Sequence, residues 1–215
     1  MRKKPAKERI TKIIKILRKA YPKSKTALRN ESPFELLIST ILSAQCRDER
    51  VNKITPGLFK KYKSPRDFAR VRQAVLEKKI RSTGFYRNKA KNIIATSKKI
   101  VGEFGGKVPD RMDKLTSLPG VARKTANIVL SSSFHKAEGI AVDTHVRRLS
   151  ERIGLSKKRD PNKIERDLTE VVPRKDWLDF NYLLVDHGRK ICMARKPLCP
   201  KCVIKRLCPS AGTFR

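Results

Sequence analysis

Residues 115–127 read LTSLPGVARKTAN, and this stretch decides the predicted fold. A short apolar segment enters a Pro119-Gly120 turn, and a second helical segment begins directly after the turn. The pattern predicts a helix–hairpin–helix over about 113–131. Backbone N–H groups at the start of the second helix can hold a phosphate, because a helix N-terminus attracts anions. An ordinary connection between two helices fits the turn equally well.

Lys124 follows this turn and is a candidate nucleophile. An amine is nucleophilic when it is partly deprotonated at neutral pH, and nearby cations and a helix N-terminus lower the pKa of an amine. Arg123 supplies the cation and the turn supplies the helix start. Lys124 is also one of 53 basic residues, and spacing alone favours a phosphate contact.

A second motif, AVDTHV at 141–146, places Asp143 where an apolar segment ends and a helix begins. The simplest interpretation is a helix N-cap, and a capping carboxylate is held in place near the positive end of the helix. A carboxylate fixed near a lysine can also transfer protons for it. His145, in the first turn, is expected to be structural rather than catalytic.

The chain ends in four closely spaced cysteines, Cys192, Cys199, Cys202 and Cys208, with the spacing C-x6-C-x2-C-x5-C. Such a set predicts ligands for one metal centre. Two CxxC pairs would suggest tetrahedral zinc, whereas a wide first gap and a single CxxC favour a larger iron–sulfur cluster. The fifth cysteine, Cys46, lies in an apolar helical pattern and is predicted to be a small buried residue.

The chain has 215 residues, 53 of them Lys or Arg and 20 Asp or Glu, which gives a formal net charge of +33. This charge predicts a polyanionic partner, and together with the cysteines it favours DNA over an anionic membrane surface. No segment has the roughly 20 apolar residues of a membrane-spanning helix. The start, MRKKPAKERI, lacks the apolar core of a signal peptide. We therefore expect a cytoplasmic, nucleoid-associated protein whose thiols stay reduced.

Helical signals recur along the chain and strand signals are scarce, so an all-α fold is predicted. Apolar residues at helical spacing mark 10–17, and a capping box with proline at the first helical position marks 32–35. A similar start signal occurs at 64–67, a helix over 88–104 stops at two glycines, and Asp160-Pro161 opens another helix. The last long helix includes 177–185.

Three motifs in register, LPGVARKTAN, AVDTH and the cysteine tail, resemble the endonuclease III family of DNA glycosylases, in the helix–hairpin–helix Gly/Pro-Asp superfamily. The likeness covers nearly the whole chain and includes LSAQ at 42–45, GFYRNKA at 84–90 and HGR at 187–189. It implies two helical domains that flank a DNA-binding cleft. One is a six-helix domain over 25–136. The other combines 1–24 with 137–215 and holds a [4Fe–4S] cluster in the loop 192–208.

The resemblance also implies the chemistry. Lys124 matches the nucleophile that attacks C1′ of a flipped, damaged pyrimidine nucleotide, and Asp143 matches the aspartate that assists this attack. The base leaves, a Schiff base forms, and β-elimination cuts the strand. The implied partner is double-stranded DNA with damaged bases or abasic sites, bound by a monomer.

Further residues match DNA-contacting positions of the family. Gln45 matches the residue that enters the gap left by the flipped base, and Phe85 matches a wedge position where leucine is expected. The remaining implied DNA contacts are Gly120, Ala122, Arg123, Thr125 and His145. Ala122 replaces a usual glycine, so strain is expected if that site needs a positive φ.

Two other functions compete with this interpretation. A monofunctional mismatch glycosylase of the same fold would lack the lysine, so Lys124 argues against it. A non-catalytic DNA-binding protein with a structural zinc tail would lack the visible absorption of an iron–sulfur cluster.

Overall fold

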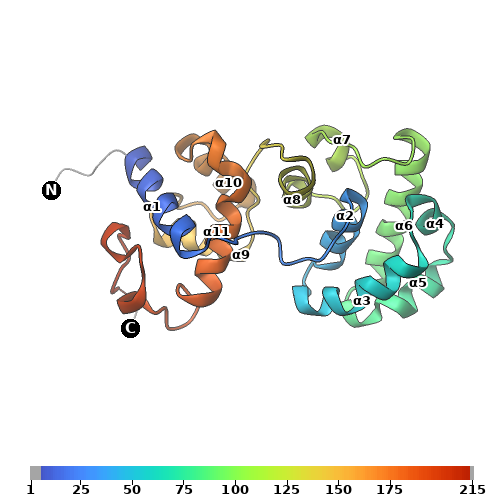
Figure 1. Ribbon diagram of the computed structural model, residues 1–215, viewed down its shortest axis with the longest axis horizontal. Helices are drawn as coiled ribbons and strands as arrows, with labels where there is room; N and C mark the ends of the chain where they lie inside the picture. The colour runs from blue at the N-terminus through green and yellow to red at the C-terminus, as the bar shows by residue number, and fades with distance from the viewer. Residues whose placement is uncertain (1–5, 214–215) are drawn as a thin grey trace. The chain divides into compact units, whose positions relative to one another are not determined.

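The computed structural model of the protein describes residues 6–213. These residues form α-helices and short 3-10 helices with no strand, which confirms the predicted all-α fold (Figure 1). None of the helices in this range combines the length and apolar composition that crossing a bilayer requires. The signal-peptide prediction depends partly on residues 1–5, and these residues lie outside the described range.

The chain forms two compact units, each with its own apolar core. One unit comprises residues 26–135, and the other combines 1–25 with 136–215. We call them the hairpin unit and the cysteine unit. Each core is a separate cluster of buried aliphatic and aromatic side chains.

The hairpin unit contains seven α-helical segments and one 3-10 turn. They are α2 (Pro33–Leu42), α3 (Asp48–Lys61), α4 (Pro65–Arg70), α5 (Gln73–Ile80), η1 (Arg81–Thr83), α6 (Tyr86–Glu103), α7 (Met112–Thr116) and α8 (Arg123–Phe134). Six helices are expected from the sequence. Two extended residues, Val71 and Arg72, separate the short helices α4 and α5.

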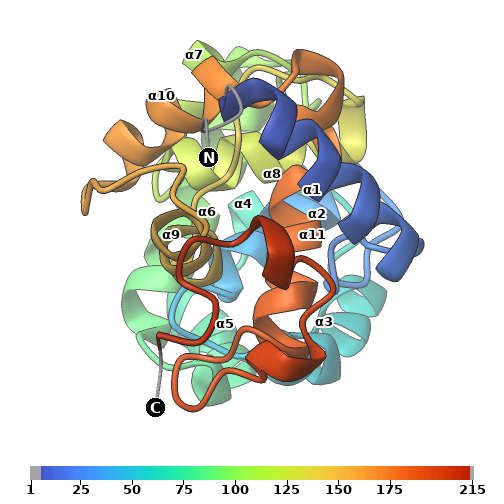
Figure 2. The ribbon, with the colours of Figure 1, turned by 90° about the vertical axis from the view of Figure 1, so that its left-hand side faces the viewer.

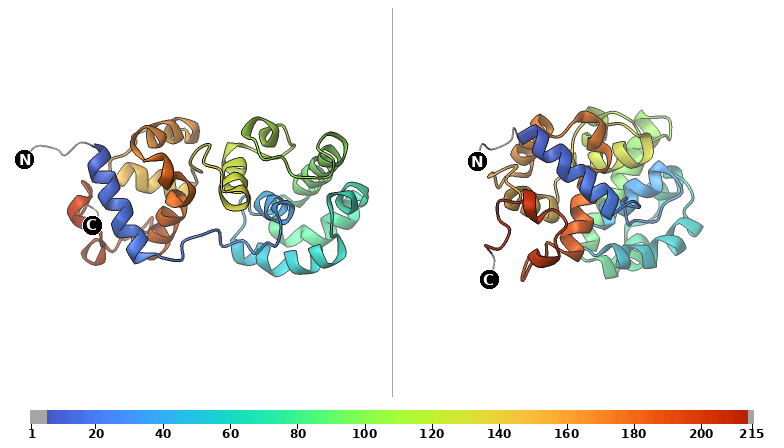
Figure 3. Two further views of the ribbon diagram at one scale, coloured as in Figure 1. Left: turned by 45° about the horizontal axis from the view of Figure 1, so that its top comes forward. Right: turned by 60° about the vertical axis from the view of Figure 1, so that its left-hand side comes forward.

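Helix α2 is buried on all sides, beyond the single apolar face that its sequence predicts. Ser39 and Thr40 are buried along with the apolar residues. Thr40 donates its hydroxyl to the carbonyl of Leu36 within the helix, at 2.7 Å. Such a helix needs neighbours around its whole circumference, and Figure 3 shows α8 lying beside it.

The cysteine unit contains four α-helices and three 3-10 turns. They are α1 (Ala6–Ala20), α9 (Thr144–Arg152), α10 (Pro161–Val171), η2 (Arg174–Asp176), α11 (Trp177–Lys190), η3 (Cys199–Lys201) and η4 (Lys205–Leu207). The predicted stripe on α1 is confirmed, because Ile10, Ile13, Ile14 and Leu17 are all buried. The tail with η3 and η4 forms loops alongside α11 (Figure 2).

The predicted helix starts are largely confirmed. Ser64 and Asp67 form a complete capping box at α4, and Asp160 caps α10 through the amide of Lys163 at 2.9 Å. At α2 only half of the predicted box is present. Ser32 accepts from the Glu35 amide, but the Glu35 carboxylate accepts from the amide of Glu31 instead of Ser32.

The prediction for Cys46 is wrong. The residue lies beyond the end of α2, in the turn that follows Ser43, and is only partly buried. The apolar pattern ends at Leu42, because Ala44 and Gln45 are exposed and the chain turns away from the core.

Candidate active site and cluster-binding site

The hairpin between α7 and α8 is built on a tight turn. The amide of Val121 donates to the carbonyl of Leu118 at 3.1 Å, and Gly120 has a φ of +76°. Proline at the second position and glycine with positive φ at the third are the features of a type II turn. A Cβ atom on Gly120 would lie only 2.8–3.0 Å from side-chain atoms of Asn92, so the turn also depends on close packing.

Helix α6 supports this turn along one face. Asn92 contacts Gly120, the Thr96 hydroxyl donates to the carbonyl of Pro119 at 2.7 Å, and the Lys99 ammonium donates to the carbonyl of Ser117 at 3.1 Å. The three residues of α6 are four and three positions apart, the spacing of one helix face. The hairpin is therefore fixed to a long helix of its own unit.

Lys124 lies where the sequence predicts, as the second residue of α8. It is exposed, as are Ala122 and Arg123, while Thr125 is partly buried. Ala122 caps the helix with φ −89° and ψ 170°. This extended conformation suits any residue, so the expected strain at Ala122 is absent. The positive φ of the hairpin is confined to Gly120.

Gln45 and Phe85 share an unusual backbone conformation. Their φ angles are 53° and 47°, in the left-handed region that costs a non-glycine residue about 1–3 kcal/mol. Both are exposed, and the Phe85 side chain is 63% exposed. A strained backbone that presents an exposed aromatic ring is typical of a site that contacts a ligand.

Asp143 is the N-cap of α9, as predicted. Its carboxylate accepts from the amide of Val146 at 2.8 Å, and the residue is partly buried. Asp143 belongs to the cysteine unit, whereas Lys124 belongs to the hairpin unit.

His145 is packed between helices of the cysteine unit. Its Nδ1 lies 3.1 Å from Nη2 of Arg148, and a Cβ on Gly188 of α11 would lie 2.8 Å from the same Nδ1. Gly188 therefore permits close packing of α9 on α11, which fits the structural role expected for His145.

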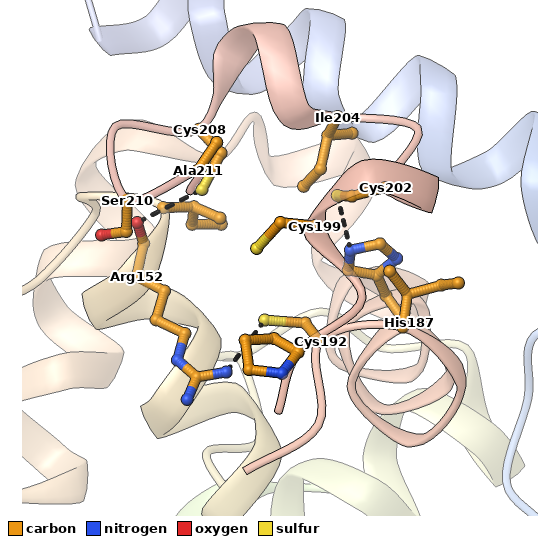
Figure 4. Close-up of a pocket in the computed structure, with 12 residues that line it drawn as sticks. Arg152, His187, Cys192, Cys199, Cys202, Ile204, Cys208, Ser210 and Ala211 are labelled. Atoms are coloured by element: carbon orange, nitrogen blue, oxygen red, sulfur yellow. Dashed lines mark hydrogen bonds between the residues drawn. The ribbon is translucent and has the colours of Figure 1, made fainter. Parts of the chain in front are cut away.

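The four tail cysteines line a single pocket. Their sulfur atoms surround a shared space in Figure 4. As placed, no three His, Cys, Asp or Glu side chains among residues 6–213 could hold a single metal ion. Tetrahedral zinc would need all four sulfurs about 2.3 Å from one point, whereas a cubane cluster is held by sulfurs spread around it. Burial raises the pKa values of the Cys202 and Cys208 thiols.

Two residues to which the sequence analysis assigned no role contact these sulfurs. Arg152 of α9 donates Nη1 to Sγ of Cys192 at 3.3 Å and to the carbonyl of Met193 at 2.7 Å. His187 of α11 has its Nε2 3.4 Å from Sγ of Cys202 and its Nδ1 2.9 Å from the hydroxyl of Tyr21 (Figure 4). Burial lowers the pKa of His187 to about 4, so the ring is neutral at pH 7. The one sequence signal for a role of His187 near the cysteines is that the HGR motif at 187–189 lies just before Cys192.

Arginines also fix both ends of the tail. Arg148 donates to the carbonyl of Cys192 from Nε and Nη2, at 3.2 and 3.0 Å. Arg9 of α1 donates to the carbonyl of Leu207, next to Cys208, at 3.1 Å. The pocket is therefore attached to α1, α9 and α11.

Comparisons with known proteins agree with this geometry. Residues 38–174 match the model of the HhH-GPD superfamily base excision DNA repair protein. The chain belongs to this superfamily. It is 53% identical over 205 residues to an endonuclease III of Synechocystis sp., covering 95% of this chain and 94% of that protein. It is 44% identical over 189 residues to an endonuclease III of Bacillus subtilis, covering 87% and 86%.

Several solved structures share the fold. A non-covalent endonuclease III–DNA complex and a trapped endonuclease III–DNA covalent intermediate each match with a TM-score of 0.91 and 40% identity, over 96% of this chain and 97% of theirs. A thermostable thymine-DNA glycosylase, 24% identical, shares the fold with a TM-score of 0.87 over 96% of this chain and 98% of its own. The prediction of a base excision repair glycosylase of the endonuclease III type is confirmed.

Proposed function

We propose that Lys124 and Asp143 carry out the chemistry of a bifunctional DNA glycosylase and AP lyase that acts on damaged pyrimidines and abasic sites in duplex DNA. The observation that carries this proposal is the placement of Lys124. It is exposed in the first turn of α8, directly after a turn that is anchored to α6. A mobile phosphate-binding lysine would not need this support, whereas a nucleophile gains from fixed orientation.

The proposed reaction begins with extrusion of the damaged nucleotide, which costs less than extrusion of a normal one. The neutral amine of Lys124 attacks C1′, and the bond from C1′ to the base breaks. The base leaves with a proton that Asp143 helps to transfer. The sugar ring then opens as a Schiff base forms between C1′ and Lys124. Loss of a C2′ proton breaks the C3′–O bond, and water releases the lysine.

Gln45 and Phe85 are proposed to enter the DNA stack at the lesion. Their exposure and left-handed backbone support this role. Phe85 would act as an apolar wedge, which holds a kink by separating base steps. The hairpin residues Gly120, Ala122, Arg123 and Thr125 would contact phosphates, and such contacts position the protein without reading sequence. His145, which is partly buried beside Arg148, is a further proposed DNA contact.

Cys192, Cys199, Cys202 and Cys208 are proposed to hold a [4Fe–4S] cluster. Their placement around one shared space, together with the wide first gap and single CxxC of their spacing, supports this cluster. When bound, the cluster would cross-link the tail and keep its exposed basic residues, Arg195, Lys196 and Lys201, in place for contact with the DNA backbone. The proposed reaction needs no electron transfer.

Borohydride trapping tests the catalytic proposal. Lys124→Ala should still bind duplex DNA with an abasic site but form no reduced covalent adduct. Lys78→Ala is the matched control, since it removes an exposed lysine of α5 in the same unit and should trap normally. Strong trapping by Lys124→Ala would contradict the assignment. We also propose that the protein is a cytoplasmic, nucleoid-associated monomer, and sedimentation of the free protein tests the monomeric state.

A further inference from the structure

Lys89 is the one lysine in the buried core of the described chain, residues 6–213. It lies in the first turn of α6 and is only 5% exposed. Its ammonium group donates to the carbonyl of Leu42 at 2.7 Å and to the carbonyl of Thr83 at 2.8 Å. Leu42 is the last residue of α2, and Thr83 is the last residue of η1. Both carbonyls lie at helix C-termini, which carry partial negative charge and lack a partner within the helix.

The two carbonyls begin the two loops that present the exposed, strained residues. Gln45 lies three residues after Leu42, and Phe85 lies two residues after Thr83. The backbone amide of Lys89 also donates to the carbonyl of Phe85, at 3.1 Å. Lys89 therefore forms hydrogen bonds to both loops, although the loops lie about 40 positions apart in the chain.

Core stability alone does not explain a lysine at this position. Within the described residues, no carboxylate forms an ion pair with Lys89, and burial lowers the pKa of its ammonium group. A buried charge stabilises a core less well than an apolar side chain of similar volume.

We propose that Lys89 is a positioning residue that fixes the Gln45 and Phe85 loops at one spacing, so that both side chains enter the DNA together at the lesion. The proposal rests on the function proposed for Gln45 and Phe85. Lys89 itself would touch neither the DNA nor the reacting atoms.

The test compares two substrates in the full-length protein. One is a duplex with a single damaged pyrimidine, which must be extruded. The other carries the same lesion in an unpaired bubble, where extrusion costs little. Lys89→Met keeps the length of the side chain and removes its donors. We expect its kcat/KM to fall by about 10²-fold on the duplex, the effect of a misplacement of about 1 Å, and to stay close to normal on the bubble.

Two controls separate positioning from loss of stability. Ile93→Ala removes a fully buried side chain one turn further along α6 and touches neither carbonyl through a hydrogen bond. Assayed at a temperature equally far below its own Tm as Lys89→Met is assayed below its Tm, Ile93→Ala should keep the normal ratio of kcat/KM on the duplex to kcat/KM on the bubble. Lys89→Arg keeps donors for both carbonyls and should restore part of the ratio. If Lys89→Met does not fold, Lys89→Leu, which also lacks donors, replaces it, with the same expected loss.

Equal losses on both substrates, or the same altered ratio in Ile93→Ala, would overturn the proposal. Phe85→Ala distinguishes this failure from failure of the proposed DNA role. If Phe85→Ala lowers the ratio and Lys89→Met does not, only the positioning role is wrong. If neither variant changes the ratio, the proposed entry of Phe85 into DNA is wrong as well. When both proposals hold, the double variant should be little worse than Phe85→Ala, because the two changes affect one step.

Discussion

Gly120→Ala should destabilise the hairpin unit for two separate reasons. Alanine at φ +76° pays the left-handed penalty of about 1–2 kcal/mol. The new Cβ would also lie 2.8–3.0 Å from Nδ2, Cβ and Cγ of Asn92. Because two of these three atoms lie near the backbone of α6, a rotation of the amide group alone does not relieve the contact. Overpacking of this kind costs about 1–3 kcal/mol more.

The sum, about 2–5 kcal/mol, corresponds to a fall in Tm of roughly 4–20 °C at 2–4 °C per kcal/mol for a chain of this size. Thermal unfolding followed by circular dichroism measures the fall, and hydrogen exchange across α7 and α8 locates it. The double variant Gly120→Ala with Asn92→Ala removes Nδ2 and Cγ of Asn92 but keeps its Cβ at 2.9 Å, so it should recover only a portion of the steric loss. The φ penalty should remain.

Ala122→Gly is the matched control in the same hairpin. Ala122 is exposed and extended, so a glycine there should change stability by no more than about 0.5 kcal/mol. A Gly120→Ala variant as stable as the unmodified chain would refute this reasoning. A double variant no more stable than the single one would show that the Asn92 amide group is not the obstacle.

Four further predictions follow from the site and its supports. Asp143→Asn should slow base removal by about 10²–10⁴-fold in single-turnover assays with abasic-DNA binding intact; a near-normal rate would leave Asp143 as a helix cap. Cys202→Ser should lower iron content and the visible absorption of the purified protein, and full iron occupancy would show that the ligand set is wrong. The hydrogen bond from Ser64 lowers the pKa of Asp67, so the stability contributed by this carboxylate should be present above about pH 4 and lost as pH falls through the lowered value. The difference in unfolding free energy between the unmodified chain and Asp67→Asn should therefore shrink in acid. A difference that stays constant with pH would contradict this. Undamaged-duplex binding should weaken with salt at about −0.9 in log K per phosphate contact, while the preference for damaged duplex persists; a preference lost in parallel would favour a non-catalytic DNA-binding protein.

The features that the sequence predicted well are local. Ser64 and Asp67, three residues apart, form the predicted capping box, and Asp143 caps α9 through an amide three residues on. Such contacts join neighbours in the chain, so their spacing is visible in the sequence. The hairpin was predictable for the same reason, since Pro119-Gly120 specifies its turn.

The supports of the site were not predictable, because they join residues far apart in the chain. Lys89 bonds a carbonyl 47 positions away, and Arg152 bonds a cysteine 40 positions away. Each is one basic residue among 53, with nothing local to distinguish it. The left-handed backbone at Gln45 and Phe85 also left no signal in the sequence, because glutamine and phenylalanine do not favour positive φ.

The expectation of strain at Ala122 shows how a motif can mislead. The motif indicates which residue usually occupies a position, but not the backbone angle there. In this hairpin the positive φ belongs to Gly120, while Ala122 is already in the extended conformation that precedes a helix. The substitution therefore costs the hairpin nothing in backbone strain.

The nucleophile is tested most directly by identifying the residue that carries the trapped DNA. The unmodified protein is reduced with borohydride on duplex DNA bearing a damaged pyrimidine, digested, and analysed by mass spectrometry of the cross-linked peptide. The adduct should map to Lys124, within the peptide that begins the helix α8. An adduct on any other lysine, or base release without an adduct, would contradict the proposed mechanism.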